Sequence, residues 1–498
     1  MEKKISPVII GASQFTQDKE LTPRLDPVGL MEKVCEDLFS NLDNKIRTII
    51  DGVYMVNINS WSYEDAPERL SKKLGIAPKE KVYLPDGGDT PQKLANRASK
   101  AISSGKREAI LIIGAESAYS VYQAKKGNLQ LNWPEKKKPT YMEGELWNGI
   151  NDFENKYKLI VPAYTYALFE TALRALKGRS IEEHQRIIGE LFAKFSKIAS
   201  EHPYAWNNNS YTANEIITPS KKNRLVAHPY TKRMCSNMFV DQAACILMTS
   251  EEVAMELKVD ENSWVYLMGG SDLKDIHEIT RRPSLTNSLP VKMGVEIALK
   301  QAGLTIDKID TFDIYSCFPS IVEIIVEELG LTLNDSRDFT ITGGLPYFGG
   351  PWSNYSLHAI VTAVHRIQED PSLNIMVVAN GGYNTKKSIG VYGKNPPKIS
   401  WNRRDDSEIQ QKILSRGLEE PVQKAEGLIS VDAYTIPYDR EGKPKNFILL
   451  GTLENGRRTL AYLLSDSKEL KNLQEKILVG KKFKVNYIPK KDINMIKL

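Results

Sequence analysis

The chain has 498 residues, of which 41% are hydrophobic and 26% are charged, which is ordinary for a globular protein. At about 100–200 residues per domain, this length predicts two to four domains, each able to bury its own core. The formal net charge of +5 is too small to indicate a nucleic-acid-binding protein. The four cysteines form no Cys-x-x-Cys pair and the six histidines are scattered, which argues against a disulfide framework and against a metal site.

The first residues, MEKKISPVIIGASQF, contain an apolar run that is too short for the core of a signal peptide. No apolar stretch approaches the about 18–20 residues that are needed to cross a bilayer. We therefore expect a cytoplasmic protein without a membrane span.

The first part of the chain alternates predicted strands with predicted helices. Residues 7–12 (PVIIGA), 52–59 and 108–114 (EAILIIG) are short apolar runs that predict buried strands. Residues 31–39 and 91–102 have helical spacing. This alternation predicts an α/β domain with a largely parallel sheet.

Residues from about 120 to 230 lack that alternation. They include NWPEKKKP (132–139) and WNNNSYTAN (206–214) among helical segments, and we interpret them as an insertion that covers one end of the sheet. The strand pattern returns at 243–249 and 263–269.

A second α/β region follows. It predicts a helix over 291–302, a strand over 311–315, a helix over 319–330 and a buried strand over 374–379. Because both regions use the same order of elements, the pattern suggests an internal duplication.

A Lys-Asn-Pro-Pro-Lys stretch ending at residue 398 marks a boundary. Beyond it, short alternating segments (428–436, 447–453, 459–465 and 483–488) predict a small antiparallel barrel or sandwich. This tail has 20 Lys and Arg against 14 Asp and Glu, which accounts for the basic excess of the whole chain. A basic barrel can hold single-stranded nucleic acid. Its strands lack clustered aromatics, however, so we favour a docking or structural role.

Five segments, in order, resemble the thiolase superfamily. GGDTPQKLANRASKAISSGKREAILIIGAESAYS (87–120) is similar to the stretch from the nucleophile helix to the Gly-x-Glu-Ser turn, and MFVDQAACILMTSEEVA (238–254) to the strand that closes the first half. YSCF (315–318) corresponds to His-Asp-Cys-Phe of sterol-carrier-protein-type thiolases, GGLPYFGGPWSNYSLHA (343–359) to the Gly-His-Pro loop, and NGGYNTKKSIGVYG (380–393) to the last glycine-rich turn. Over residues 5–395 the chain looks most like thiolase-like protein type 1, a group with an additional C-terminal domain.

The resemblance implies an α/β thiolase fold, in which two βαβαβ halves form a five-layer αβαβα sandwich with an inserted loop domain that binds CoA. We add a small C-terminal all-β domain, an OB-like barrel. The expected domains are an N-terminal half (1–275, with the loop domain at about 120–230), a C-terminal half (276–397) and the barrel (398–498). Acyl-CoA is then the substrate, no cofactor is tightly bound, and the lysines at 136–138 either meet the CoA phosphates or are simply solvated.

The resemblance also shows which thiolase groups are absent. The nucleophilic cysteine, whose thiolate carries the acyl group in a thiolase, falls at Gly88, and no cysteine lies between Cys35 and Cys235. The histidine of Gly-His-Pro is replaced by Gly350. Any chemistry is therefore expected to proceed without a cysteine acyl-enzyme.

Two further positions keep side chains that can transfer protons. Cys317 matches the cysteine of His-Asp-Cys-Phe and opens a predicted helix, where amide dipoles favour a thiolate. The alternative is a small buried hydrophobe. Tyr315 replaces the family's oxyanion-hole histidine and can donate a hydrogen bond. Tyr347 and Tyr355 lie in the loop that approaches the same pocket, and each tyrosine has a structural alternative.

Two more candidates follow from the same alignment of motifs. Asn380 supplies an amide donor or only shapes its turn, and His358 is a catalytic residue or a packed helix residue. We predict that six glycines form turns that pass close to the ligand, where a Cβ would obstruct. These are Gly343, Gly344, Gly349, Gly350, Gly381 and Gly382.

The favoured function is an acetyl-CoA acetyltransferase-like enzyme of lipid and fatty acid metabolism. It would make or break a carbon–carbon bond beside a CoA thioester, by proton transfer at Cys317 or Tyr315. The alternative is a catalytically inactive acyl-CoA-binding or scaffold protein whose C-terminal domain docks a partner. The resemblance allows a homodimer or a monomer, and the sequence leaves the acyl chain and the reaction direction open.

Overall fold

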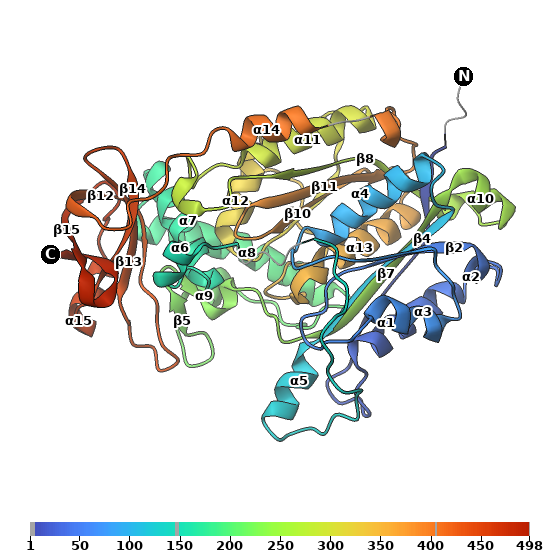
Figure 1. Cartoon of the computed structure of the whole chain (residues 1–498), viewed down its shortest axis with the longest axis horizontal. Helices are drawn as coiled ribbons and strands as arrows, with labels where there is room; N and C mark the ends of the chain where they lie inside the picture. The colour runs from blue at the N-terminus through green and yellow to red at the C-terminus, as the bar shows by residue number, and fades with distance from the viewer. Residues whose placement is uncertain (1–4, 145–148, 404–405, 498) are drawn as a thin grey trace.

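The computed structural model describes residues 5–144, 149–403 and 406–497. Its core is a nine-stranded sheet with the order β3-β2-β4-β7-β1-β8-β11-β10-β9 (Figure 1). The strands are β1 (Pro7–Thr16), β2 (Ile50–Met55), β3 (Glu80–Tyr83), β4 (Ala109–Ser117), β7 (Asp241–Ser250), β8 (Val265–Lys274), β9 (Thr311–Ile314), β10 (Ile375–Gly381) and β11 (Lys386–Gly393).

The strand order shows the internal duplication. From edge to centre the first half reads β3-β2-β4-β7-β1, and the second reads β9-β10-β11-β8, which is the same order without the outermost strand. An extended segment takes the vacant edge position, since Phe312 N and Ile314 N donate to Asp338 O and Phe339 O at 3.0 and 2.9 Å. Because β8 corresponds to β1, we propose that the second half begins before β8 rather than after residue 275.

The expectation of a largely parallel sheet is wrong. Strand β2 runs parallel to β3 and β4, and β10 parallel to β9. The pairs β4–β7, β7–β1, β1–β8, β8–β11 and β11–β10 are antiparallel. In each half the last strand does not follow a single crossover helix: β7 returns after the long insertion, and β11 follows β10 through a tight turn. Two strands can pair in parallel only if a crossover connection, usually a helix, returns the chain to the same end of the sheet, and these last strands therefore pair antiparallel.

Two central helices lie between the halves, as a five-layer sandwich requires. Helices α4 (Thr90–Ser103) and α13 (Tyr355–Glu369) contact each other and strands of both halves. Proline at the first turn of α4 and the left-handed Gly105 after it set its limits. The outer helices of the first half are α1 (Pro27–Phe39) and α3 (Ala66–Leu74), and those of the second half are α11 (Leu289–Ala302) and α12 (Pro319–Glu328). Two short helices, α2 (Ile46–Ile49) and α10 (Glu251–Glu256), lie at strand ends.

The insertion between β4 and β7 is mainly helical, and its helices α7 and α8 contact α12 of the second half. The longest helix, α8, is capped by Ser180, whose side-chain oxygen accepts from Glu183 N. It buries one apolar face. Its elements are α5 (Ala118–Lys125), α6 (Asp152–Lys156), α7 (Pro162–Leu176), α8 (Ile181–Glu201), α9 (Ala213–Ile217), β5 (Leu225–Ala227) and β6 (Tyr230–Thr231). No helix in the described part of the chain is both long and apolar enough to cross a membrane.

The C-terminal region is a closed barrel with the order β12-β13-β14-β16-β15, which confirms the predicted OB-like barrel. Strands β14 and β16 are parallel, and a helix separates the third strand from the fourth. The elements are α14 (Ser407–Leu414), β12 (Glu426–Thr435), β13 (Phe447–Leu453), β14 (Arg458–Leu463), α15 (Ser467–Gln474), β15 (Lys482–Ile488) and β16 (Ile493–Lys497), of which β16 was not predicted.

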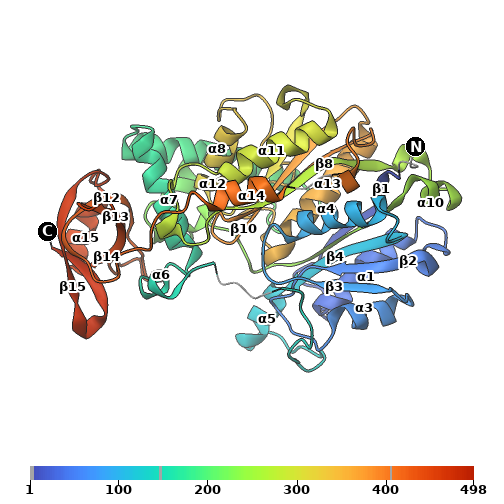
Figure 2. The ribbon, with the colours of Figure 1, turned by 45° about the horizontal axis from the view of Figure 1, so that its top comes forward.

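The barrel lies at one end of the molecule, against the insertion (Figure 2). Thr171 of α7 donates to Tyr434 O at 2.9 Å and accepts from Tyr434 N at 3.1 Å. Tyr157 accepts from Asn494 N at 2.8 Å. Since these polar groups are buried, their hydrogen bonds hold the barrel in a fixed orientation. The contacts support a structural role for the tail.

Candidate functional site

Three loops bring the predicted chemistry together at one edge of the second half-sheet. Strands β9 and β10 are parallel and in register, so Tyr315, directly after β9, and Asn380, in the last residues of β10, lie at the same end of these strands. Tyr315 N donates to Val378 O at 3.0 Å and extends this pairing by one residue. The start of α4, with Gly88, reaches the same place from the first half, because a Cβ at Gly88 would touch both Tyr315 and Asn380.

Gly88 lies directly against the tyrosine ring. An ideal Cβ at Gly88 would lie 2.5 Å from Cε2 and Cζ of Tyr315 and would also collide with the Asn380 carbonyl oxygen. Ser356 Oγ donates to Gly88 O at 2.7 Å, which fixes the backbone from the other side. A side chain at position 88 is therefore incompatible with this arrangement of Tyr315.

Cys317 is linked to Asn380 through a tyrosine that the sequence analysis missed. Tyr166 of α7 lies near Cys317 and interacts with its thiol, and the Tyr166 hydroxyl oxygen accepts from Asn380 Nδ2 at 3.3 Å. Burial raises the pKa of the Cys317 thiol to about 12, partly offset by Tyr166 and by the charge of Lys387. The thiol is therefore protonated at neutral pH.

Lys387 is the second residue that the sequence analysis missed. Its Nζ donates to Asn380 Oδ1 at 2.6 Å, and its side chain is buried in β11. Burial lowers the pKa of Lys387 to about 7. A sequence signal exists, because a lysine inside a strand of otherwise buried residues is rarely solvated. Tyr166 carries no such signal, since its role depends on the insertion folding over the site.

The two loop tyrosines differ in their surroundings. Tyr355 donates to Asp313 Oδ1 at 3.0 Å, and its ring centroid lies 5.5 Å from that of Tyr315. Asp313 also accepts from the backbone N–H groups of Ile341 and Thr342, at 3.0 and 3.1 Å. Tyr355 therefore supports Tyr315 and the 340–344 loop. The buried Tyr347 hydroxyl has no hydrogen-bond partner among the described residues.

His358 lies apart from this group. It is fully buried on α13, and its Nδ1 is 2.9 Å from Gln14 Oε1 of β1. Burial lowers the pKa of His358 to about 3, so the imidazole is neutral. Its ring packs against Phe348, and no contact recorded for the described residues joins it to Cys317 or Tyr315. The structure thus places His358 in the interface between the two halves.

Other segments of the chain fill the space beside five of the six predicted glycines. A Cβ at Gly343 would meet Ala199 of α8, and one at Gly349 would meet Gln242 of β7. Both have φ in the left-handed region, at 101° and 121°. Close approach of protein to protein therefore accounts for these glycines, and their contact with a ligand stays a prediction. The five are Gly343, Gly344, Gly349, Gly350 and Gly381, and the sixth, Gly382, has φ of 57°.

Two of the three lysines at 136–138 have protein partners. Lys137 Nζ is 3.0 Å from Glu64 Oε2, and Lys136 lies over the Trp61 ring at 4.3 Å from its centroid. Exposed pairs of this kind contribute little stability and remain free to exchange partners. Their contact with CoA phosphates stays a prediction.

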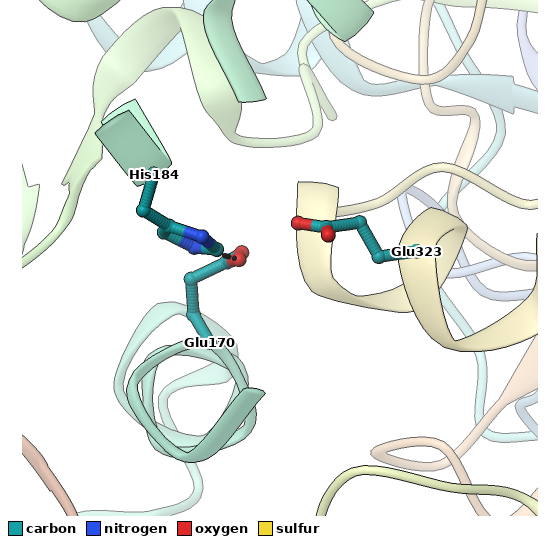
Figure 3. Close-up of side chains that lie close together, drawn as sticks. All are labelled: Glu170, His184 and Glu323. Atoms are coloured by element: carbon teal, nitrogen blue, oxygen red, sulfur yellow. Dashed lines mark hydrogen bonds and ion pairs between the residues drawn. The ribbon is translucent and has the colours of Figure 1, made fainter. Parts of the chain in front are cut away.

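A cluster of metal-ligand type lies outside this site. One ligand atom each of Glu170, His184 and Glu323 lies within 4.8 Å of the other two, and all three side chains are buried (Figure 3). They come from α7, α8 and α12. No motif in the sequence predicted the cluster, because Glu323 is far from Glu170 and His184 in the chain.

Hydrogen bonding favours a charge network over a metal centre. Arg179 Nη1 lies 3.2 Å from His184 Nδ1 and 2.7 Å from Glu323 Oε2. Since the guanidinium only donates, Nδ1 must accept, and the ring proton sits on Nε2, 2.7 Å from Glu170 Oε1. That tautomer leaves no lone pair on Nε2 for a metal ion. The network joins the insertion to the second half.

Comparisons with known proteins agree with this architecture. A family model described as "Thiolase-like protein type 1 additional C-terminal domain" matches residues 408–487. An acetyl-CoA acetyltransferase of Methanocaldococcus jannaschii is 22% identical over 286 residues, and the match spans 56% of this chain and 65% of the archaeal protein. Human mitochondrial 3-ketoacyl-CoA thiolase in complex with CoA has the same fold, with 16% identity, a TM-score of 0.55 and coverage of 78% of this chain and 98% of that chain.

One solved structure matches over the whole length. The monomeric SCP2-thiolase-like protein type 1 of Mycobacterium smegmatis is 30% identical, covers 100% of both chains and has a TM-score of 0.86. The match includes the C-terminal barrel as well as both halves and the insertion. The chain therefore belongs to the thiolase-like protein type 1 family.

Proposed function

We propose that this protein binds an acyl-CoA and acts on it without a cysteine acyl-enzyme. The reaction makes or breaks a carbon–carbon bond beside the thioester, with proton transfer at Cys317 and a hydrogen bond from Tyr315. The homologous acetyltransferase and thiolases support an acyl-CoA substrate. The cytoplasmic location and the role in lipid metabolism stay predictions of the sequence.

The observation that carries the proposal is the position of the Tyr315 ring. It lies against Gly88, where a thiolase would need a cysteine, and leaves no room for a Cβ there. The acyl group therefore has no sulfur to receive it at this position. A phenol hydroxyl can instead donate a hydrogen bond to a thioester or keto oxygen as negative charge develops on it.

The remaining chemistry falls to Cys317, two residues after Tyr315 in the chain. It lies in the loop that follows β9, just before α12, whose first-turn amides favour negative charge. The thiol gives a proton to the substrate and the resulting thiolate takes one back, so the residue acts as an acid and a base in turn.

The test is turnover of a panel of 3-hydroxyacyl- and 3-oxoacyl-CoAs by the wild type and by Cys317→Ala and Tyr315→Phe. We expect turnover in the wild type and a loss of 100-fold or more in each variant, about 3 kcal/mol of transition-state stabilisation. Cys245→Ala, which removes a buried thiol from β7, is the matched control.

Intact mass after incubation with acetyl-CoA should show no acyl adduct. A stable adduct would contradict the proposal directly. Binding of CoA thioesters with no turnover of any panel member would favour the inactive acyl-CoA-binding protein instead.

A further inference from the structure

The candidate site is well supplied with hydrogen-bond donors. Burial raises the pKa of Cys317 to about 12, and burial with the charges of Cys317 and Asp89 raises that of Tyr315 well above its ordinary value, so both keep their protons at neutral pH. The amine of Lys387 also donates, to two amide oxygens. A residue that gives a proton to the substrate must be balanced by a group that accepts one from it. Asp89, which directly follows Gly88, carries such a group.

The Asp89 carboxylate is buried with an unsatisfied oxygen. The residue is 4% exposed, and its Oδ1 has no hydrogen-bond partner among the described residues. No ion pair within the described part of the chain includes it. Burying a carboxylate oxygen without a donor is costly, so this arrangement indicates that a donor reaches the carboxylate from outside the protein.

The carboxylate does not cap its own helix. Asp89 occupies the N-cap position of α4, where an aspartate ordinarily accepts from a free N–H group of the first turn. Here no such bond forms, and the backbone is helical, with φ of −77° and ψ of −21°, instead of extended. The free amides of the helix still favour a negative charge at this end. Helix capping therefore does not account for the carboxylate.

Glycines from both halves make room for this carboxylate. An ideal Cβ at Gly381, at the end of β10, would collide with Asp89 Oδ1, and so would one at Gly87. The Cβ at Gly381 would also lie 3.1 Å from Gly88 N, while one at Gly88 would lie 2.5 Å from the Tyr315 ring. The unsatisfied oxygen and the phenol thus lie on either side of Gly88, within the candidate site.

An oxygen that only accepts hydrogen bonds selects its ligand. A carboxylate binds a hydroxyl or N–H group, whereas a carbonyl oxygen offers it no donor. Of the two substrate classes of the proposed function, a 3-hydroxyacyl-CoA has a hydroxyl at C3 and a 3-oxoacyl-CoA has only an acceptor there. We propose that Asp89 binds the 3-hydroxyl group of a 3-hydroxyacyl-CoA and is the base that removes its proton.

This proposal deepens the proposed function, on which it rests, by naming the substrate class and the base. The hydroxyl proton moves to Asp89, the electron pair of the O–H bond forms the carbonyl at C3, and the C2–C3 bond breaks. The pair from that bond moves into the thioester as an enolate, whose oxygen accepts from Tyr315. Cys317 then gives its proton to C2. Asp89 releases its proton to solvent and the thiolate takes one back, so a carbonyl compound and a shorter acyl-CoA form without an oxidant or reductant.

The first test measures binding in the full-length protein, with Cys317→Ala present throughout to prevent turnover. Calorimetry compares 3-hydroxybutyryl-CoA with acetoacetyl-CoA, and 3-hydroxydecanoyl-CoA with 3-oxodecanoyl-CoA. We expect at least tenfold tighter binding of the 3-hydroxy member of a pair. Adding Asp89→Asn should abolish or reverse this preference, because the amide can donate to the 3-oxo oxygen.

Asp86→Asn is the matched control, because Asp86 lies in the same loop and accepts from the side-chain amides of Asn57 and Asn59. The preference for the 3-hydroxy member should survive this change. In a protein that retains Cys317, Asp89→Asn should lower kcat for the 3-hydroxyacyl-CoA by about 100-fold or more, a loss typical of a missing general base.

The proposal is overturned if the protein with Asp89 intact shows no preference for the 3-hydroxy member, a result that needs no Asp89 variant to fold. It is also overturned if a folded Asp89→Asn protein keeps the preference. A preference that depends on Asp89, without turnover of any CoA thioester, would defeat the proposed function and the role of Asp89 as a base, and would leave Asp89 as the hydroxyl-binding residue.

Discussion

The two halves of the molecule share one strand order but differ in what they bring to the site. The first half contributes the segment just before α4, where Gly88 leaves only backbone against the Tyr315 ring. The second half contributes Tyr315, Cys317 and the strained β10–β11 turn with its buried amine. The comparison teaches that the two halves keep one strand order but not one set of side chains: the second half supplies Tyr315, Cys317 and Lys387, and the insertion supplies Tyr166.

The largest effect is expected at Lys387, whose amine is buried in β11 of the second half. The pKa of Lys387 is lowered from 10.5 to about 7 in the folded protein. Between these pH values the unfolded chain binds one more proton than the folded protein, so the free energy of unfolding rises with pH from about 7 to 10.5. Below pH 7 the folded protein carries the full free-energy cost of burying the Lys387 ammonium. The stability of Lys387→Met relative to the wild type should therefore be about 4 kcal/mol more favourable at pH 6 than at pH 10.

Urea unfolding at both pH values checks this expectation. Lys386→Met serves as the control, and its stability should show no comparable dependence on pH. Equal stability differences for Lys387→Met at pH 6 and pH 10 would mean that the amine stays charged when buried.

The next largest effect tests the first half. Gly88→Cys restores a thiol where a thiolase has one, but its Cβ would collide with Tyr315 and the Asn380 carbonyl oxygen. We expect a loss of about 3 kcal/mol in stability and no acyl adduct by intact mass. Gly417→Cys is the control, because its Cβ would lie 3.6 Å from the nearest atom. A stable and acylated Gly88→Cys protein would show that the two halves are less different than proposed.

A smaller effect is expected at the interface between the halves. His358→Leu leaves the buried Gln14 Oε1 without its 2.9 Å partner. Stability should fall by about 2 kcal/mol, because an unpaired buried acceptor keeps its desolvation cost. Cys317→Ala should reduce turnover far more than stability. If His358→Leu instead loses turnover as completely as Cys317→Ala, the imidazole belongs to the chemistry.

The smallest effect is expected at the surface. Lys137→Ala removes a 3.0 Å ion pair with Glu64 in which the two side chains are 60% and 57% exposed. Stability should change by less than about 0.5 kcal/mol in thermal or urea unfolding. Affinity for CoA, measured by calorimetry, should stay within twofold of the wild type, and a larger loss would bring these lysines into the binding site.

The sequence analysis predicted the elements that local interactions determine and missed those that depend on pairing with distant segments. Apolar runs such as 108–114 and the helical spacing of 91–102 predict β4 and α4 well, because burial and local periodicity set both. The short strand β3 and the last strand β16 were missed. Only four or five residues long, they carry too little pattern, and pairing with neighbours distant in sequence defines them.

By itself the sequence determined the α/β halves, the insertion, the separate barrel and the absence of a cysteine at position 88. Each of these depends on local pattern or on which residue type is present. Only the tertiary structure decided the mixed direction of the sheet, the place of His358 apart from Cys317, and the network that joins Tyr166, Asn380 and Lys387. These depend on how segments pack in three dimensions; Tyr166, for example, meets Asn380 and Asn384, more than 200 residues away, only when the insertion packs over the second half.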